Sequence, residues 1–222
     1  SVSEVEIKDG QVTAAVTEST IQLEQGDLQV TAFVGQAEDY TDLDNTMEDL
    51  NLPPGDYNLY SLAIAGGVSL DIEPEGELAL GVDGVGAGIG SSTEIDVAAS
   101  VNDSSITLND GKLSVTATDN LAIYNDAGGA SVSFQLAANT AIGIVAGIGA
   151  GVHTSVNTIA AGITDSTLAV TGGLDVEAKA DGSVNGIGFG VAVDTSIASS
   201  VAVGFASSAG VADVTLRNAL NA

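Results

Sequence analysis

A short phrase of apolar and polar positions recurs about six times along this chain. Each copy reads apolar-x-apolar, then a turn of three to five polar or glycine-containing residues, then apolar-x-apolar again. The copies begin at Val5, Ile21, Leu70, Ile106, Leu168 and Val214. Alternation with a period of two is typical of strands that bury one face. The phrase therefore predicts a repeated strand-turn-strand unit and an all-β protein.

The clearest alternation lies in residues 185–206. Ile187, Phe189, Val191 and other bulky apolar residues hold the odd positions, whereas glycine and alanine hold most of the even ones. A strand directs these two sets to opposite faces. We expect the bulky face to fill a core and the smooth face to allow another element to pack closely.

Two architectures fit a repeated corner. In a parallel β-solenoid, or β-helix, each phrase forms one corner of a coil and glycine supplies a turn residue with positive φ. In the alternative, an antiparallel β-sandwich, each phrase is a hairpin, which Asp9-Gly10 and Asp110-Gly111 would suit. The flat glycine- and alanine-rich strands favour the solenoid. Coils of about 20–25 residues at about 4.8 Å each would give a body about 45 Å long.

The segment 35–61 interrupts the pattern. It is acidic, and Tyr40, Leu43, Met47 and Leu50 are spaced as on a helix that ends before Pro53. We expect a short helical or loop insertion near 38–52. The chain then divides into first β repeats (1–34), an acidic tyrosine-containing insertion or cap (35–61), and a Gly/Ala/Val-rich β-solenoid (62–222).

Two stretches carry a family resemblance. Ala160–Ala178 (AAGITDSTLAVTGGLDVEA) and Ala99–Ala117 (ASVNDSSITLNDGKLSVTA) resemble the repeats of very large bacterial surface proteins, the filamentous-haemagglutinin-like and giant adhesin families. The glycine-rich Ala141–Ile163 is similar to their lead-in. The resemblance covers residues 95–222 and part of 1–34, but not 35–61. It implies an exported β-helical stalk or filament at the bacterial cell surface, and it implies no catalytic residues.

The composition narrows the range of functions. Thirty Asp and Glu against four Lys and Arg give a net charge of −26 across 222 residues. Such a chain repels nucleic acid, because phosphate contacts need clustered cations. With no cysteine, disulfides and thiolate chemistry are excluded. His153 is the only histidine and is interpreted as structural or surface-exposed, so we expect no enzyme. We also expect no membrane insertion.

The insertion holds the candidate ligand sites. Asp42, Asp44 and Glu48 place oxygens at alternate positions, as calcium prefers, so calcium is the one cofactor that the sequence offers. Tyr40, Tyr57 and Tyr60 are candidates for contact with a glycan. The alternative function is therefore a glycan- or calcium-binding surface module.

The phrases nearest the two termini suggest how the protein assembles. If the ends of a solenoid are uncapped, their strands are open sheet edges that pair with another strand. Val5, Ile7 and Val12 in the first copy, and Val214, Leu216 and Leu220 in the last, are the expected assembly edges. The expected partner is the chain itself, head to tail or laterally, or adjacent repeats of the same solenoid. The sequence thus favours an extracellular structural segment.

Overall fold

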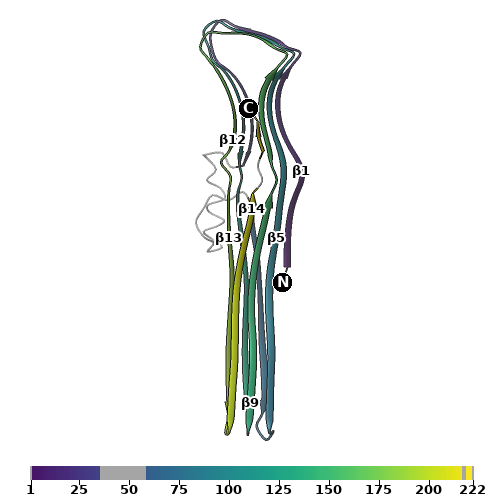
Figure 1. The fold of residues 1–222 in the computed structure, drawn as a ribbon, viewed down its shortest axis with the longest axis vertical. Coiled ribbons are helices and arrows are strands. Elements are labelled where there is room, and N and C mark those ends of the chain that lie inside the picture. Colours follow the sequence, from purple (N-terminus) through teal and green to yellow (C-terminus); the bar gives the residue numbers. More distant parts are fainter. Residues whose placement is uncertain (1, 36–58, 217–218, 222) are drawn as a thin grey trace.

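A computed structural model describes residues 2–35, 59–216 and 219–221, and these form strands connected by turns (Figure 1). The expected helix near 38–52 lies outside the described residues. The strands are β1 (Val2–Thr17), β2 (Thr20–Leu23), β3 (Leu28–Gly35), β4 (Leu59–Glu73), β5 (Leu78–Asn102), β6 (Ser105–Leu108), β7 (Leu113–Asn120), β8 (Ala122–Ala137), β9 (Thr140–Ser155), β10 (Thr158–Thr164), β11 (Thr167–Val170), β12 (Leu174–Ala180), β13 (Ser183–Ala198), β14 (Val201–Leu216) and β15 (Ala219–Asn221).

Every strand pairing in the described chain is parallel, which confirms the solenoid rather than the sandwich. Four sheets run side by side along the stack: β1, β5, β9–β10 and β14–β15 form sheet A; β2, β6 and β11 form sheet B; β3, β7 and β12 form sheet C; and β4, β8 and β13 form sheet D. The chain visits sheets A, B, C and D in turn and then returns to A one strand further along. The strands of the 1–34 segment thus belong to the same sheets as those of residues 62–222.

The coils are much larger than the sequence suggested. Leu78 pairs with Thr140 and Ser105 pairs with Thr167, so one coil takes 62 residues rather than 20–25. The reason is that long strands, not extra corners, make up most of each coil: β8, β9, β13 and β14 have 16 residues each. The long dimension in Figure 1 follows the strands, and the stack is only a few strands thick.

The corner phrases separate into three kinds. The copies at Ile21, Ile106 and Leu168 stack in register as the corner between sheets B and C, as predicted. Gly26 and Gly173 there adopt φ of 111° and 121°. The copy at Leu70 forms the turn from β4 to β5. The copies at Val5 and Val214 are not corners, because both run along sheet A, the first through a register shift between Ile7 and Gly10.

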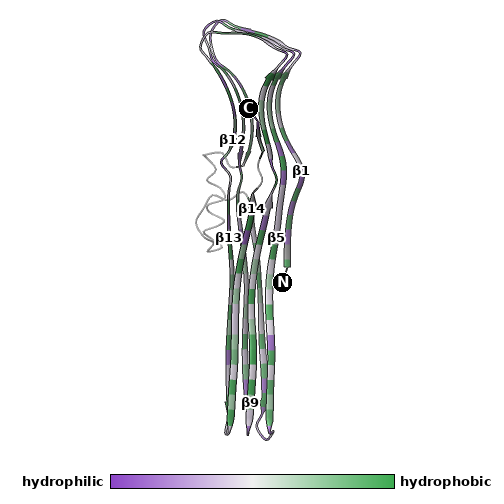
Figure 2. Cartoon of the chain, in the orientation of Figure 1, coloured by the Kyte–Doolittle hydropathy of each residue, from purple (hydrophilic) through white to green (hydrophobic). Residues whose placement is uncertain are grey.

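Each coil has a wide half and a narrow half, and apolar and polar residues alternate along the strands of both (Figure 2). The two halves are packed in opposite ways. In the wide half, sheets B and C and the adjoining part of sheet A enclose a core of Val, Ile and Leu, in which Val97, Ile106, Leu113 and Ile159 have no exposed area. In the other half, here called the blade, sheet D packs directly on strand segments of sheet A. These segments begin at the tip, the end of the blade where β4, β8 and β13 turn into β5, β9 and β14. The small buried apolar clusters of the blade consist largely of alanine, including Ala63, Ala79 and Ala127.

In the blade, the expected direction of the bulky side chains is wrong. Ile187, Phe189 and Val191 point outward and are exposed, whereas the glycines and alanines between them point inward. The expected close approach at the smooth face is confirmed, since a Cβ atom at Gly149 would overlap the carbonyl oxygens of Ala127 and Phe189. Glycine and alanine let the sheets approach to a distance at which larger side chains do not fit, so the large ones occupy the outer faces.

Candidate functional site

The strands at the two ends of the stack each have an edge that no other described strand pairs with. At one end these are β1, β2, β3 and β4; at the other they are β11, β12, β13 and β14, with β15. Each pairs on one side only within the described chain. A strand edge without a neighbour presents N–H and C=O groups at the spacing that another strand needs.

The predicted assembly residues lie on these end strands. Val5, Ile7 and Val12 are in β1, Val214 and Leu216 are in β14, and Leu220 is in β15. The register adds a relation that the sequence did not reveal. Val5 pairs with Ser91, Ser91 with His153, and His153 with Val214, so the first and last phrases occupy equivalent positions at opposite ends of sheet A.

The orientation of the free edge on β14 follows from one hydrogen bond. The Val201 N–H donates to the Asn139 carbonyl oxygen at 2.9 Å, toward β9. Because successive residues of a strand point their N–H groups to opposite sides, the N–H of Ala202 points away from β9, as does that of Ala206. These N–H groups are the donors that an added strand would use.

Between the two halves of the coil, polar side chains link the sheets internally. His153 Nδ1 lies 2.7 Å from Ser91 Oγ, which also accepts a hydrogen bond from Asn125 Nδ2 at 2.7 Å. His153 is buried, and this burial lowers the pKa of its imidazole. Of the two predicted alternatives, this position agrees with a structural His153 and not with a surface-exposed one. Its pairing with Ser91 was missed, although the two residues are one coil length apart.

A second buried group lies next to it. Asn157 Nδ2 donates to Asp119 Oδ2 at 2.6 Å, and Thr93 Oγ1 donates to Ser155 Oγ at 3.1 Å. These four side chains help to line a cavity of about 20 Å³, enough for one water molecule and too small for a substrate. Within the described residues there is no group of three or more His, Cys, Asp or Glu side chains placed to hold a metal ion.

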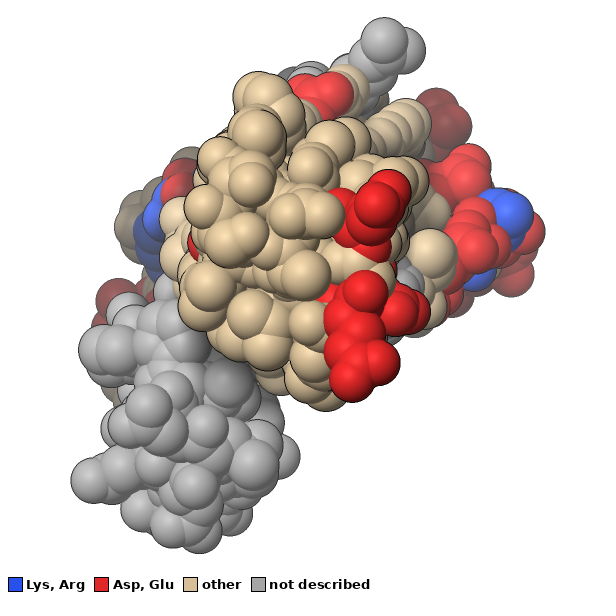
Figure 3. All heavy atoms as spheres, turned by 90° about the horizontal axis from the view of Figure 1, so that it is seen from below, with Lys and Arg blue, Asp and Glu red and all other residues tan. Residues whose placement is uncertain are grey.

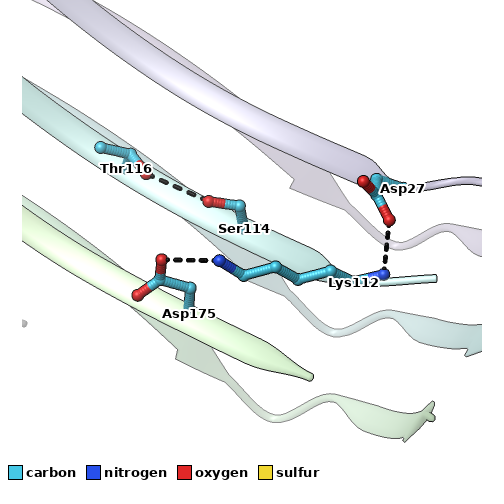
Figure 4. A network of polar contacts seen from close by, with 5 residues as sticks. All are labelled: Asp27, Lys112, Ser114, Thr116 and Asp175. Carbon is cyan, nitrogen blue, oxygen red and sulfur yellow. Dashed lines mark hydrogen bonds and ion pairs between the residues drawn. The ribbon is translucent and has the colours of Figure 1, made fainter. Parts of the chain in front are cut away.

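On the surface of the wide half, one lysine joins three coils. The Lys112 N–H donates to Asp27 Oδ1 at 2.7 Å, and its Nζ lies 3.0 Å from Asp175 Oδ2 (Figure 4). Asp27 precedes β3, Lys112 precedes β7 and Asp175 is in β12, so these contacts run along the stack. Ser114 and Thr116 form a further polar contact of 3.3 Å beside them.

The remaining predicted sites are not described. Asp42, Asp44, Glu48, Tyr40 and Tyr57 lie outside the described residues, and Tyr60 is placed only as a backbone position in β4. The calcium and glycan hypotheses therefore stay predictions. In the part of the chain that the structure describes, no helix is long and apolar enough to cross a membrane.

Comparison with known proteins adds no identity to this geometry. No family model, no curated protein and no solved structure matches the chain.

Proposed function

We propose that this chain is a structural segment, a β-solenoid stretch of a bacterial cell-surface adhesin or filament. The observation that carries the proposal is the stack itself: parallel coils in register, whose end strands pair on one side only among the described residues. Such a stack is stiff along the strands and extends by adding coils. The resemblance of residues 95–222 to surface-protein repeats supports an extracellular location.

The acidic surface suits this role. Exposed carboxylates keep single chains soluble and oppose unspecific association. Hydrogen bonds between equivalent polar residues of adjacent coils also suit a structural role, because they link one coil to the next. Ser104 Oγ accepts from the Ser19 N–H at 3.1 Å, and Ser166 Oγ accepts from the Ser104 N–H at 3.1 Å. The same arrangement thus recurs from coil to coil.

Extension from chain to chain would require an exchange of strands. Thr13 pairs with Ala98, Ala98 with Ala160, and Ala160 with Asn221, so residues 2–13 occupy positions along the stack equivalent to those of 211–216 and 219–221. If β2 and β3 of a second copy pair directly with β11 and β12 of the first, both segments would occupy the same place in sheet A. One of them therefore has to be displaced. Continuation within a longer chain requires no such exchange.

The test blocks the open edge of β14. A junction between two chains joins an edge from one end of a stack to an edge from the other end, so blocking one of them is enough. The variant Ala202→Pro with Ala206→Pro removes two N–H groups that point away from β9 and leaves the β9 ladder intact. Electron microscopy and light scattering of the unmodified chain should show particles in which several chains follow one another along the stack direction, and this variant should remove them without lowering the thermal stability. Val203→Pro is the control, because it removes a ladder bond to β9 and should lower the stability. Particles of unchanged length in the double variant would contradict end-to-end growth.

A further inference from the structure

In the blade, the face of sheet A that points away from sheet D has raised and recessed parts. The strand registers show which residues form them. Six cross-strand rows lie on this face, counted from the tip, and we call them together the blade face. The rows are Leu78–Thr140–Val201, Leu80–Ile142–Val203, Val82–Ile144–Phe205, Gly84–Ala146–Ser207, Gly86–Ile148–Ala209 and Gly88–Ala150–Val211.

The first three rows are raised and the next three are mostly recessed. Val82 is 66% exposed and Phe205 60%, although both are large apolar residues. In β5 the change is complete, since two leucines and a valine are followed by three glycines. No heavy atom lies within 4 Å of the position that a Cβ of Gly84 would take, so the recess is open.

We propose that the blade face binds the blade face of a second copy of this chain, around a two-fold axis that runs along the stack between the third and fourth rows. The proposal deepens the structural role proposed above and rests on it. The rotation sets the third row over the fourth, the second over the fifth and the first over the sixth. Large side chains then face glycines along the whole of β5, whereas on β9 and β14 Ile148 and Val211 meet Ile142 and Val201 and have to pack beside them. Val82 then faces Gly84, Leu80 faces Gly86, and Phe205 faces Ser207.

Charge favours a second copy as the occupant. No residue of the six rows is charged, in a chain whose net charge is −26. Seen from the tip, uncharged surface dominates the blade and the carboxylates gather on one side (Figure 3). The rotation also reverses the strand direction, so the acidic wide halves of the two copies point to opposite ends of the pair. A smooth apolar surface, such as a lipid bilayer, would match the raised rows but not the recess beside them.

The size of the face predicts how strong the pairing is. Three strands at about 4.8 Å and six rows at about 6.7 Å give roughly 580 Å² per copy, or about 1,160 Å² for the pair. This is near the lower limit for a specific interface, so a single pair should be weak. Because the axis is parallel to the stack, further coils extend both partners in the same direction. Each added coil then strengthens the lateral contact.

The experiment fills the recess. In the Ala202→Pro, Ala206→Pro background, whose edge is blocked, sedimentation velocity measures lateral pairing alone. We expect the mass of two chains above roughly micromolar concentration, and scattering should give a maximum dimension longer than that of one chain. Gly84→Leu should abolish the dimer and leave the fold intact. Gly66→Leu is the matched control, because Gly66 has equally open space on the outer face of sheet D and should leave the dimer unchanged.

The outcomes are separable. Unspecific hydrophobic association would grow stronger in Gly84→Leu, because that variant adds apolar surface, and this result would overturn the proposal. So would a chain that stays monomeric over the whole concentration range, an equal loss of pairing in Gly66→Leu, or binding to lipid vesicles in place of pairing. If dimers form as expected but the unblocked chain shows no growth along the stack, the end-to-end proposal is wrong and the pairing through the blade face is supported.

Discussion

The wide half and the blade of each coil reach a stable interior by opposite means. In the wide half, large aliphatic side chains such as Leu113 and Ile106 fill the space between three sheets, and polar residues lie outside. In the blade, two sheets are packed mainly through glycine, alanine and serine, and most of the large aliphatic side chains lie outside, with Ile89 and Val145 as buried exceptions. The alternation of residues is the same in both halves. The difference shows that the distance between sheets, rather than the hydrophobicity of a side chain, decides which face becomes the interior.

The largest expected effect comes from adding a methyl group inside the blade. Gly149→Ala places a Cβ against the carbonyl oxygens of two opposing strands. Because backbone cannot move aside as a side chain can, we expect a loss of about 3 kcal/mol or more in the free energy of unfolding, measured in urea. Gly84→Ala on the outer face is the control and should be neutral or stabilising by about 0.5 kcal/mol. Equal losses in both variants would refute the close packing of the two sheets.

The next largest effect is expected in the wide half, where removing side-chain volume, rather than adding it, should lower the stability. Leu113→Ala removes a fully buried side chain and should cost about 2–5 kcal/mol. Ile148→Ala removes a side chain of similar size from the outer face of the blade and should cost the monomer about 1 kcal/mol or less, because 48% of Ile148 is already exposed. Thermal unfolding at low protein concentration gives both values. A loss of stability in Ile148→Ala as large as in Leu113→Ala would contradict the contrast between the halves.

A smaller effect should appear where the halves meet. Burial lowers the pKa of His153 below 6.5, so the folded state disfavours the imidazolium. The stability that depends on the neutral ring is present above pH 6.5 and is lost as the pH falls through and below this value. The slope is at most about 1.4 kcal/mol per pH unit. The difference in unfolding free energy between the wild type and His153→Gln, measured from pH 7 to 5, should therefore narrow. A constant difference would mean that the ring titrates alike in both states.

The smallest effect is expected on the acidic surface. Lys112→Met removes the ion pair with Asp175 but keeps the main-chain bond to Asp27. Both side chains are about half exposed, so the loss should be under about 0.5 kcal/mol and should vanish at high salt. Chemical denaturation in urea at two salt concentrations tests it. A loss that persists in high salt would point to packing of the lysine stem instead.

The sequence predicted the strands and favoured the parallel stack, but it did not show which face of the blade strands is buried. Alternation shows that Ile187 and Phe189 share a face, yet which face is buried depends on a sheet from elsewhere in the coil. The corner phrases at Ile21, Ile106 and Leu168 were recognised, whereas the similar phrases at Val5 and Val214 run along one sheet. A phrase of this kind shows local alternation and a break, and it does not show how sharply the chain turns.

The role of the candidate assembly residues stays a prediction. The structure shows only that their strands, β1, β14 and β15, lie at the ends of the described stack. The Ser91–His153 contact was missed because it joins positions 62 apart, a coil length that the irregular spacing of the phrases concealed. The blade face could not be foreseen, because its rows combine residues from three strands whose register only the structure supplies.

The register also shows where the coil tolerates change. Gly35 pairs with Asn120, 85 positions further on, whereas Leu59 pairs with Ile123, 64 positions further on. The connection between β3 and β4 is therefore 21 residues longer than its counterpart in the next coil, and yet the chain returns to register. For evolution or protein design, we therefore expect this junction to accept sequences of different length, such as a new binding sequence, while the register of the coils stays the same.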